Sequence, residues 1–236
     1  ITFINLNFNL KENDIIYTHA DFVESLFDIL KKFKFQNIKV ISSQSDRKIT
    51  KSLFNKKPKS VSSWYATNVI YNTDSLIPIP LGIAPYRNSK SAIIEDFIDL
   101  EFRQIKQKFM YLNFNLNTNY FHRIKTVNSA HRIFEIEPTE DKNYKDYLIS
   151  LGSHKFSLSP WGNGIDTHRF WESLYCGTIP ITKSHYIYKT FDGLPMVLLK
   201  SYKRLINLKK EIEFDEFNLE KLDINWWIKQ IKQIKV

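Results

Sequence analysis

The sequence has 236 residues and a formal charge of +9 at pH 7, from 34 Lys and Arg against 25 Asp and Glu. Its 43% hydrophobic and 15% aromatic content is typical of a globular chain, and no apolar run reaches the roughly 18 residues of a membrane span. A single cysteine, Cys176, excludes an internal disulfide and a cysteine-based metal cluster, and it favours a reducing compartment. We expect a cytoplasmic protein with one large domain or two small ones.

Apolar periodicity and turn residues predict an alternation of strands and helices along the whole chain. This alternation is typical of an α/β protein with parallel sheets. The expected elements are strands at 1–8, 14–17, 38–41, 109–114, 155–159, 178–181 and 194–199, and helices at 22–33, 91–108, 144–151, 166–176 and in the C-terminal tail.

In the first half, two expected strands end in polar loops. The strand at 14–17 leads into His19 and Asp21, and the strand at 38–41 leads into a loop with Asp46. Parallel strands present their carboxyl ends at one edge, where such sheets bind ligands. These three side chains are therefore candidates for an acceptor-side site, although a purely structural histidine is an equally good reading of His19.

The helix expected at 22–33 connects those two strands. Apolar residues at helical spacing predict the face that it buries: Phe22, Leu26, Ile29, Leu30 and Phe33.

A linker is expected near residues 84–90, where Pro85, Asn88 and Ser89 break the periodicity. This places an N-terminal half at 1–88 and a C-terminal half at 89–236. In the second half, the strand at 109–114 runs into an Asn-rich loop and then into Arg123. A basic side chain after such a loop can reach a phosphate group.

The densest pattern runs from Lys155 to Ile181, KFSLSPWGNGIDTHRFWESLYCGTIPI. It predicts a strand, a glycine loop, a helix and a second strand, which is the building block of a parallel sheet. Gly162 and Gly164 flank Asn163, so we expect positive φ angles and loop amides that face a ligand. The helix start adds free N–H groups and a positive dipole end, which together suit a phosphate.

The first turns of that helix carry the remaining candidates. Asp166 or Thr167 can cap the helix, and His168 can either cap it or meet a diphosphate. Arg169 and Glu172 are three residues apart and share one face, where the arginine can bind a diphosphate and the carboxylate both ribose hydroxyls. The alternative is a structural role, in which Arg169 and Glu172 form a surface ion pair with each other.

The Lys155–Ile181 segment resembles the C-terminal half of exostosin-like glycosyltransferases, whose pattern is a strand ending in Pro, a Gly turn, an Arg, and then Glu-x-Leu-x-x-Gly-x-Ile-Pro. The layout is also similar to that of fucosyltransferases, which have a Glu-Lys version of the helix. The resemblance implies a GT-B fold, with two Rossmann-like halves facing across a cleft and a final helix that crosses back. It also implies that Glu172 holds the donor ribose and Arg169 the diphosphate.

We therefore expect a transferase that moves a sugar from a nucleotide-sugar donor to a glycan or glycolipid acceptor, without a cofactor. No Asp-x-Asp pair follows an expected strand, so we expect no metal. The resemblance favours inversion, for which Asp21 or His19 is the candidate base, while the residues alone leave retention open. The alternatives are a non-catalytic nucleotide-sugar-binding module and a nucleic-acid-binding protein.

The positive charge is consistent with several partners. The lysines are spread along the chain and do not form one basic arm, so nucleic acid is not the expected partner. A compositional bias that places lysines on solvated faces and a peripheral contact with an anionic membrane are the two readings left open.

Overall fold

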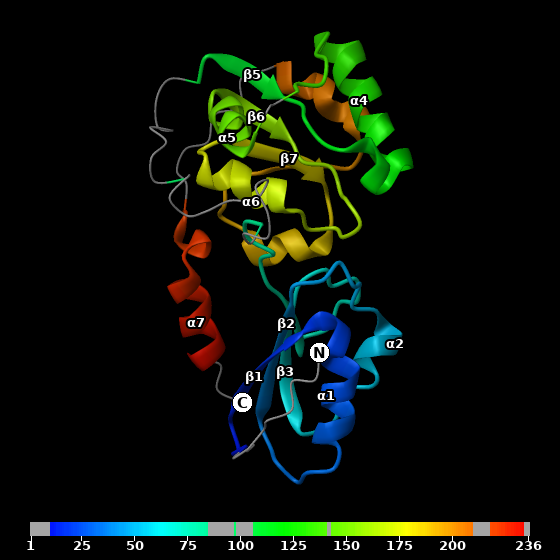
Figure 1. The fold of residues 1–236 in the computed structure, drawn as a ribbon, viewed down its shortest axis with the longest axis vertical. Helices are drawn as coiled ribbons and strands as arrows, with labels where there is room; N and C mark the ends of the chain where they lie inside the picture. The colour runs from blue at the N-terminus through cyan, green and yellow to red at the C-terminus, as the bar shows by residue number, and fades with distance from the viewer. Residues whose placement is uncertain (1–9, 85–96, 98–105, 141–142, 210–217, 234–236) are drawn as a thin grey trace. The chain divides into compact units, whose positions relative to one another are not determined.

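The computed structural model of the protein describes residues 10–84, 97, 106–140, 143–209 and 218–233 (Figure 1). These residues form an α/β protein with two four-stranded parallel sheets, which confirms the class expected from the sequence. Residues 10–79 belong to one compact unit, called unit 1 below, and the described residues from Pro80 onward belong to a second, called unit 2. The expected boundary at 88/89, the strand expected at 1–8 and nearly all of the helix expected at 91–108 lie outside the described residues.

Unit 1 contains one sheet whose strands follow chain order and are all parallel. Its elements are β1 (Ile15–His19), η1 (Ala20–Phe22), α1 (Val23–Leu30), β2 (Ile38–Ser43), α2 (Lys51–Phe54), β3 (Val61–Ala66) and β4 (Leu76–Pro78). In the register of this sheet, His19 lies opposite Ser43. The loops that leave β1 and β2 therefore start side by side.

Helix α1 forms where it is expected, but it buries a different face. Its buried residues recur at the spacing of one helix face and are Val23, Leu26, Phe27 and Leu30. Three of the five residues expected on that face are exposed, among them Phe22 at 64%. Apolar residues occur on more than one side of this helix, so periodicity alone could not select the side that meets the sheet.

The core of unit 1 is built around an aromatic pair. The rings of Phe27 and Trp64 are 5.0 Å apart in an edge-to-face arrangement, and both side chains are fully buried. The indole N–H of Trp64 donates to the Ser42 hydroxyl over 2.8 Å. This polar group is therefore satisfied inside the core.

Unit 2 also contains four parallel strands in chain order. Its elements are β5 (Lys108–Tyr111), η2 (Leu116–Asn119), α4 (Tyr120–Phe134), α5 (Tyr144–Gly152), β6 (His154–Leu158), α6 (His168–Tyr175), β7 (Ile179–Lys183), η3 (Tyr186–Phe191), β8 (Val197–Leu199), η4 (Tyr202–Lys209), η5 (Glu220–Leu222) and α7 (Ile224–Gln233).

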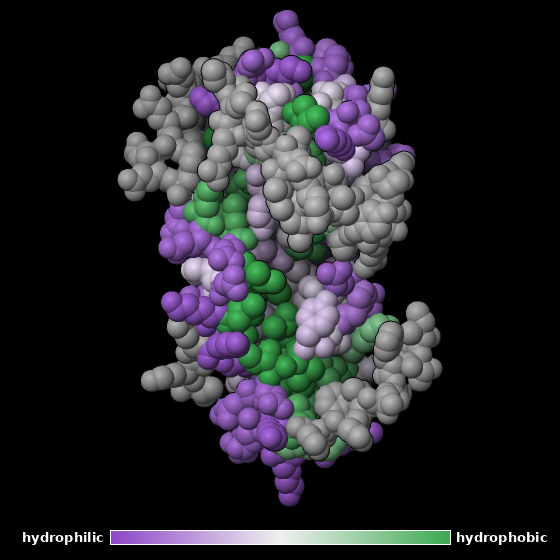
Figure 2. All heavy atoms as spheres, turned by 60° about the vertical axis from the view of Figure 1, so that its left-hand side comes forward, coloured by the Kyte–Doolittle hydropathy of each residue, from purple (hydrophilic) through white to green (hydrophobic). Residues whose placement is uncertain are grey.

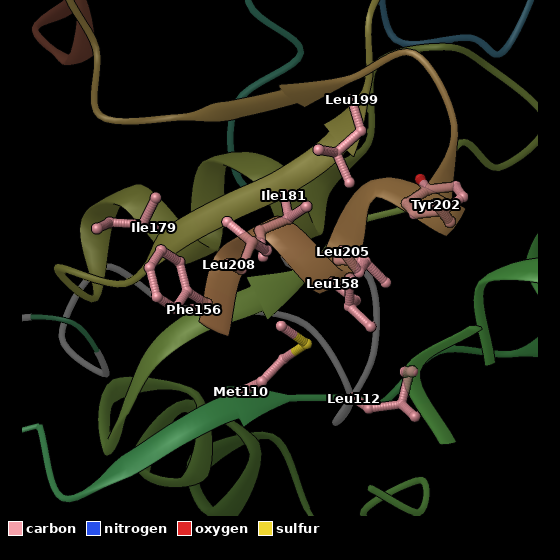
Figure 3. Close-up of a cluster of buried hydrophobic side chains, with 11 residues drawn as sticks. Met110, Leu112, Phe156, Leu158, Ile179, Ile181, Leu199, Tyr202, Leu205 and Leu208 are labelled. Carbon is pink, nitrogen blue, oxygen red and sulfur yellow. The ribbon is translucent and has the colours of Figure 1, made fainter. Parts of the chain in front are cut away.

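Hydrophobic clusters cover both faces of this sheet. On one face, side chains from all four strands pack against α4 and η4; Figure 3 shows Leu205 and Leu208 of η4 among the strand residues. Tyr111 points to the other face, where it packs with α5 residues and Cys176. Cys176 is buried, and burial raises the pKa of its thiol.

Helix α4 was not predicted from the sequence. The buried side chains that it contributes are small or polar, and they are Arg123, Thr126, Ser129 and Ala130. Val127, Ile133 and Phe134 also pack against the core as partly buried residues, but the polar residues interrupt the apolar pattern on that side, so the helix signal is weak. Arg123, which was expected just after a loop, therefore lies in a helix.

Hydrophobic residues also remain on the surface, and Figure 2 shows them in green beside hydrophilic residues on one face. Within the described part of the chain, no helix is both long and apolar enough to cross a membrane.

Candidate anion site

The predicted strand–loop–helix–strand unit is confirmed by β6, α6 and β7. Strands β6 and β7 are paired in parallel through Phe156 and Ile179, and the glycine loop leaves the carboxyl end of β6. No side chain caps the first turn of α6, so the positive end of its dipole is not neutralised by a cap. This edge of the sheet holds all the donor-side candidates.

The glycine loop is folded back on itself. The Gly162 N–H donates to the Gly164 carbonyl over 3.0 Å, and the Gly162 carbonyl accepts from the Asn119 side chain over 2.9 Å. The expectation that this amide faces a ligand is therefore wrong. The expected positive φ angles are wrong too, because the glycines with positive φ among the described residues are Gly82, Gly177 and Gly193.

Gly162 is needed here for a different reason. A Cβ at this position would lie 2.9 Å from the Nη2 atom of Arg123, closer than real Cβ contacts allow. Glycine therefore lets the guanidinium lie directly against the loop. Gly164 is buried, whereas Asn163 is exposed at the tip.

Arg123 lies near the start of α4 and is almost fully buried. Its Nε donates to the Trp161 carbonyl over 3.1 Å, and its Nη1 donates to the Asn115 carbonyl over 2.5 Å. The guanidinium thus joins the loop after β5 to the loop after β6. Carbonyls supply hydrogen bonds but no compensating negative charge.

Arg169 lies beside Arg123. The Cζ atoms of Arg123 and Arg169 are 5.4 and 5.8 Å from the centre of the Phe114 ring, so both guanidinium groups lie against one aromatic side chain. Burial, followed by the charge of Arg169, lowers the pKa of Arg123 to about 10. Arg123 therefore still carries its charge at neutral pH.

Among the described residues, no carboxylate forms an ion pair with either arginine. Within the same part of the chain, the buried Nε of Arg169 has no hydrogen-bond partner. Two partly buried positive charges repel each other, and a bound anion between them would remove this repulsion. A diphosphate offers oxygens that match the planar forks of two guanidinium groups.

Glu172 is only 5% exposed, and both of its oxygens are occupied by tyrosine hydroxyls. Tyr144 donates to Oε1 over 3.0 Å, and Tyr147 donates to Oε2 over 2.7 Å. The reading of Arg169 and Glu172 as a surface ion pair is therefore wrong, because no such pair forms and the carboxylate is buried. Each oxygen keeps one further lone pair for another donor.

Tyr147 connects the carboxylate to the arginines. The Cζ of Arg169 lies 5.7 Å from the centre of the Tyr147 ring, whose hydroxyl binds Glu172. Burial, and then the charge of Glu172, raises the pKa of Tyr147 well above its usual value. The tyrosine hydroxyl is therefore a fixed donor at neutral pH.

Asp166 holds the loop together from inside. It is buried, and its carboxylate accepts from the backbone N–H groups of Leu81 and Thr167 and from the indole of Trp171 at 2.8 to 2.9 Å. Burial raises its pKa to about 7. These contacts position the start of α6 and do not direct Asp166 at a ligand.

His168 is the first residue of α6, and its Nδ1 lies 2.8 Å from the Gly82 carbonyl. Thr167 occupies the cap position, so the structure does not place His168 there. Phe170 and Trp171, which follow, are fully buried, as expected for core residues.

The corresponding edge of unit 1 carries the acceptor-side candidates. His19 Nδ1 lies 3.6 Å from an Asp21 carboxylate oxygen, and the other oxygen accepts from Ser45 over 2.7 Å. The loops after β1 and β2 are thus brought together as expected. Asp46 is exposed in the second loop.

Sequence reasoning missed the aromatic framework of the unit 2 site, which consists of Phe114, Tyr144 and Tyr147. A signal for the two tyrosines was present, because they are three residues apart on an expected helix and must share a face. Phe114 had no such signal, since it was expected as a strand residue. In the described ranges, no group of three or more His, Cys, Asp or Glu side chains could hold a metal ion.

No known protein-family model matches this chain, and neither does any curated protein.

Proposed function

We propose that the protein is a glycosyltransferase that binds a nucleotide-sugar donor in unit 2 and transfers the sugar to a glycan or glycolipid acceptor. The observation that carries the proposal is the pair Arg123 and Arg169, which share the Phe114 ring and have no carboxylate partner among the residues that the structure describes. The pair lies at the carboxyl edge of a parallel sheet, where α/β proteins bind nucleotides.

The chemistry of transfer explains the need for such a pair. As the bond to the sugar breaks, negative charge accumulates on the departing nucleoside diphosphate. Fixed positive charge in a partly dry site stabilises that charge better than water does. Arg123 is anchored by two carbonyls and Arg169 is held between two aromatic rings, so both are in place before the reaction starts.

Glu172 is proposed to accept the ribose hydroxyls. The half-buried Tyr144 hydroxyl occupies one of its oxygens, and a ribose would displace that hydroxyl while Tyr147 stays in place. Tyr144→Phe then leaves donor binding unchanged or tighter, whereas Glu172→Gln weakens it about tenfold. Weaker binding in Tyr144→Phe would assign the ribose to another group.

The acceptor side is proposed to use the unit 1 edge, as the GT-B arrangement suggested by the sequence resemblance would require. In an inverting reaction Asp21 or His19 takes the acceptor proton. Whichever of Asp21→Asn and His19→Gln removes the base is expected to lower kcat at least about a hundredfold while donor binding is kept. Normal turnover in both variants would favour retention or another base.

Donor binding is tested by thermal shift with a panel of nucleoside diphosphates and nucleotide sugars, without and then with a divalent metal. A ligand at a hundred times its Kd adds about 2.7 kcal/mol to stability. Arg169→Ala should abolish that shift and Arg169→Lys should reduce it, because lysine keeps the charge but loses the two-pronged geometry.

Arg204→Ala is the matched control for this experiment, since Arg204 is exposed and lies outside the site. The proposal fails if every nucleotide leaves the melting temperature of the folded protein unchanged. A nucleotide sugar that binds but is neither transferred nor hydrolysed would identify a non-catalytic binding module. Asp21 is hydrogen-bonded to Ser45 and Glu172 to two tyrosines, so neither carboxylate is free of partners. The non-catalytic binding module is therefore the second candidate function.

A further inference from the structure

A second basic cavity lies in unit 2, beside the arginine pair and distinct from it. It lies between α4 and the chain after β7 and β8 and has a volume of about 730 Å³. A cavity of this volume is of the size that small-molecule sites usually have. Neither Arg123, Arg169 nor Glu172 lines it.

The lining of this cavity, called the basic pocket below, is positive. Its charged lining residues all carry positive charge and are Lys125, Arg132, Lys183, Lys200 and Lys203. None of the lining residues is acidic, and none of these five cations forms an ion pair in the described part of the chain. Five unpaired cations around one hollow repel each other, and an anion would relieve that repulsion.

Neutral side chains complete the pocket. Asn119, Asn128 and Ser201 offer hydrogen bonds, and Phe121, which is 80% exposed, offers an aromatic face. His122 also lines the pocket, and its buried Nε2 has no hydrogen-bond partner among the described residues. This atom is therefore a polar group that a ligand could satisfy.

The positive charges around the basic pocket also affect the pKa of His122. Burial, and then the charges of Lys183, Arg123 and Lys125, lowers the pKa of His122 to about 4. An anion in the pocket would oppose those charges and raise this pKa. His122 stacks on Trp161 with ring centres 5.2 Å apart, and the Nζ atom of Lys183 lies 5.2 Å from the centre of the Trp161 ring.

We infer that the basic pocket binds a small ligand that carries two or more phosphate groups. The number of cations exceeds what one phosphate can contact, and a cavity of about 730 Å³ is of the size that binds a small molecule rather than an extended strand of nucleic acid. The inference does not rest on the proposed function, because the arginine pair is not part of the pocket.

The probe is inorganic pyrophosphate, titrated by calorimetry at constant ionic strength. Pyrophosphate can also occupy the arginine pair, so the titration is made in the wild type and in Arg169→Ala. Binding should persist in Arg169→Ala. Two further substitutions are then made in the Arg169→Ala variant, Lys125→Ala in α4 and Lys200→Ala after β8, both at exposed positions. Together they should weaken pyrophosphate binding about tenfold or more.

The control is the double variant Lys189→Ala with Lys229→Ala. It removes the same charge from exposed positions outside the pocket and should bind pyrophosphate as the wild type does. In a second measurement by NMR, saturating pyrophosphate should raise the pKa of His122. Inorganic phosphate should bind more weakly than pyrophosphate.

Three outcomes would overturn the inference. If Arg169→Ala alone removes all binding, the arginine pair is the sole site for pyrophosphate. If the control variant loses as much affinity as the pocket variant, the attraction is a general effect of net charge. If an oligonucleotide binds in the pocket but pyrophosphate does not, the surface recognises a nucleic-acid backbone.

Discussion

The two sheets of this protein are built alike but differ in how the charges at their carboxyl edges are paired. Each has four parallel strands in chain order. In unit 1 the edge carries carboxylates that already have partners, such as Asp21 with Ser45 and Glu24 with Arg47. In unit 2 the edge carries arginines that, within the described ranges, have no carboxylate partner.

This difference shows what the architecture provides and what it leaves to the side chains. Parallel strands bring loops together at one edge in both units, so both edges are suitable places for a site. The charge of the loop residues then decides which edge attracts an anion. The fold therefore determines where a binding site can lie, and the side chains at that place determine which class of ligand it attracts.

The largest expected effect comes from the two cores. Phe27 of unit 1 and Phe156 of unit 2 are both buried, and replacing either with Ala should destabilise its own unit by about 3–5 kcal/mol. Hydrogen exchange resolved by segment is the measurement. Phe156→Ala should increase exchange in the unit 2 sheet, and Phe27→Ala in the unit 1 sheet. Exchange that rises equally in both sheets for both variants would show that the two sheets unfold together.

The second expected effect tests anion binding at the carboxyl edge of the unit 2 sheet. In Gly162→Ala the new Cβ would meet the Arg123 guanidinium at 2.9 Å and displace it from the loop. Affinity for the nucleoside diphosphate found in the thermal-shift panel should fall about tenfold, or about 1.4 kcal/mol. Asn163→Ala, one residue along and exposed, is the control and should bind normally. Equal affinity in both variants would remove Arg123 from the site.

The third expected effect is a pH dependence of stability that comes from Asp166. Its pKa is about 7 in the folded protein, above the usual 3.8, so between these values the folded state binds more protons than the unfolded state. Stability should therefore fall as pH rises from about 4 to about 7. Asp166→Asn should remove that trend, which is measured as the difference in urea unfolding between wild type and variant. A constant difference across this range would mean that Asp166 stays ionised throughout.

The smallest effect is expected at an exposed ion-pair network of unit 1. Hydrogen bonds from Lys56 and then Arg47 lower the pKa of Glu24, so its contribution is present above pH 4.5 and is lost as pH falls. Glu24→Gln should lower the melting temperature slightly at low salt and leave it unchanged at high salt, because exposed charges are screened. A loss that persists in about 1 M salt would point to packing instead.

Sequence patterns identified much of the fold because they report local geometry. The Lys155–Ile181 pattern predicts a strand, a loop, a helix and a strand, and β6, α6 and β7 confirm them. Helix α1 is also found where expected, but its buried face is not the expected one. Helix α4 was missed because the polar residues Arg123, Thr126 and Ser129 interrupt the apolar pattern on its buried side.

The sequence by itself determined that Arg169 and Glu172 share one face of a helix after a glycine loop, because their spacing fixes this. Only the tertiary structure decided that Glu172 meets two tyrosines of α5, that Arg169 shares a phenylalanine with Arg123, and that Gly162 makes room for a guanidinium. Those partners come from segments that are tens of residues apart in the chain. Packing of the sheet against its helices, and not local spacing, brings them to the same edge.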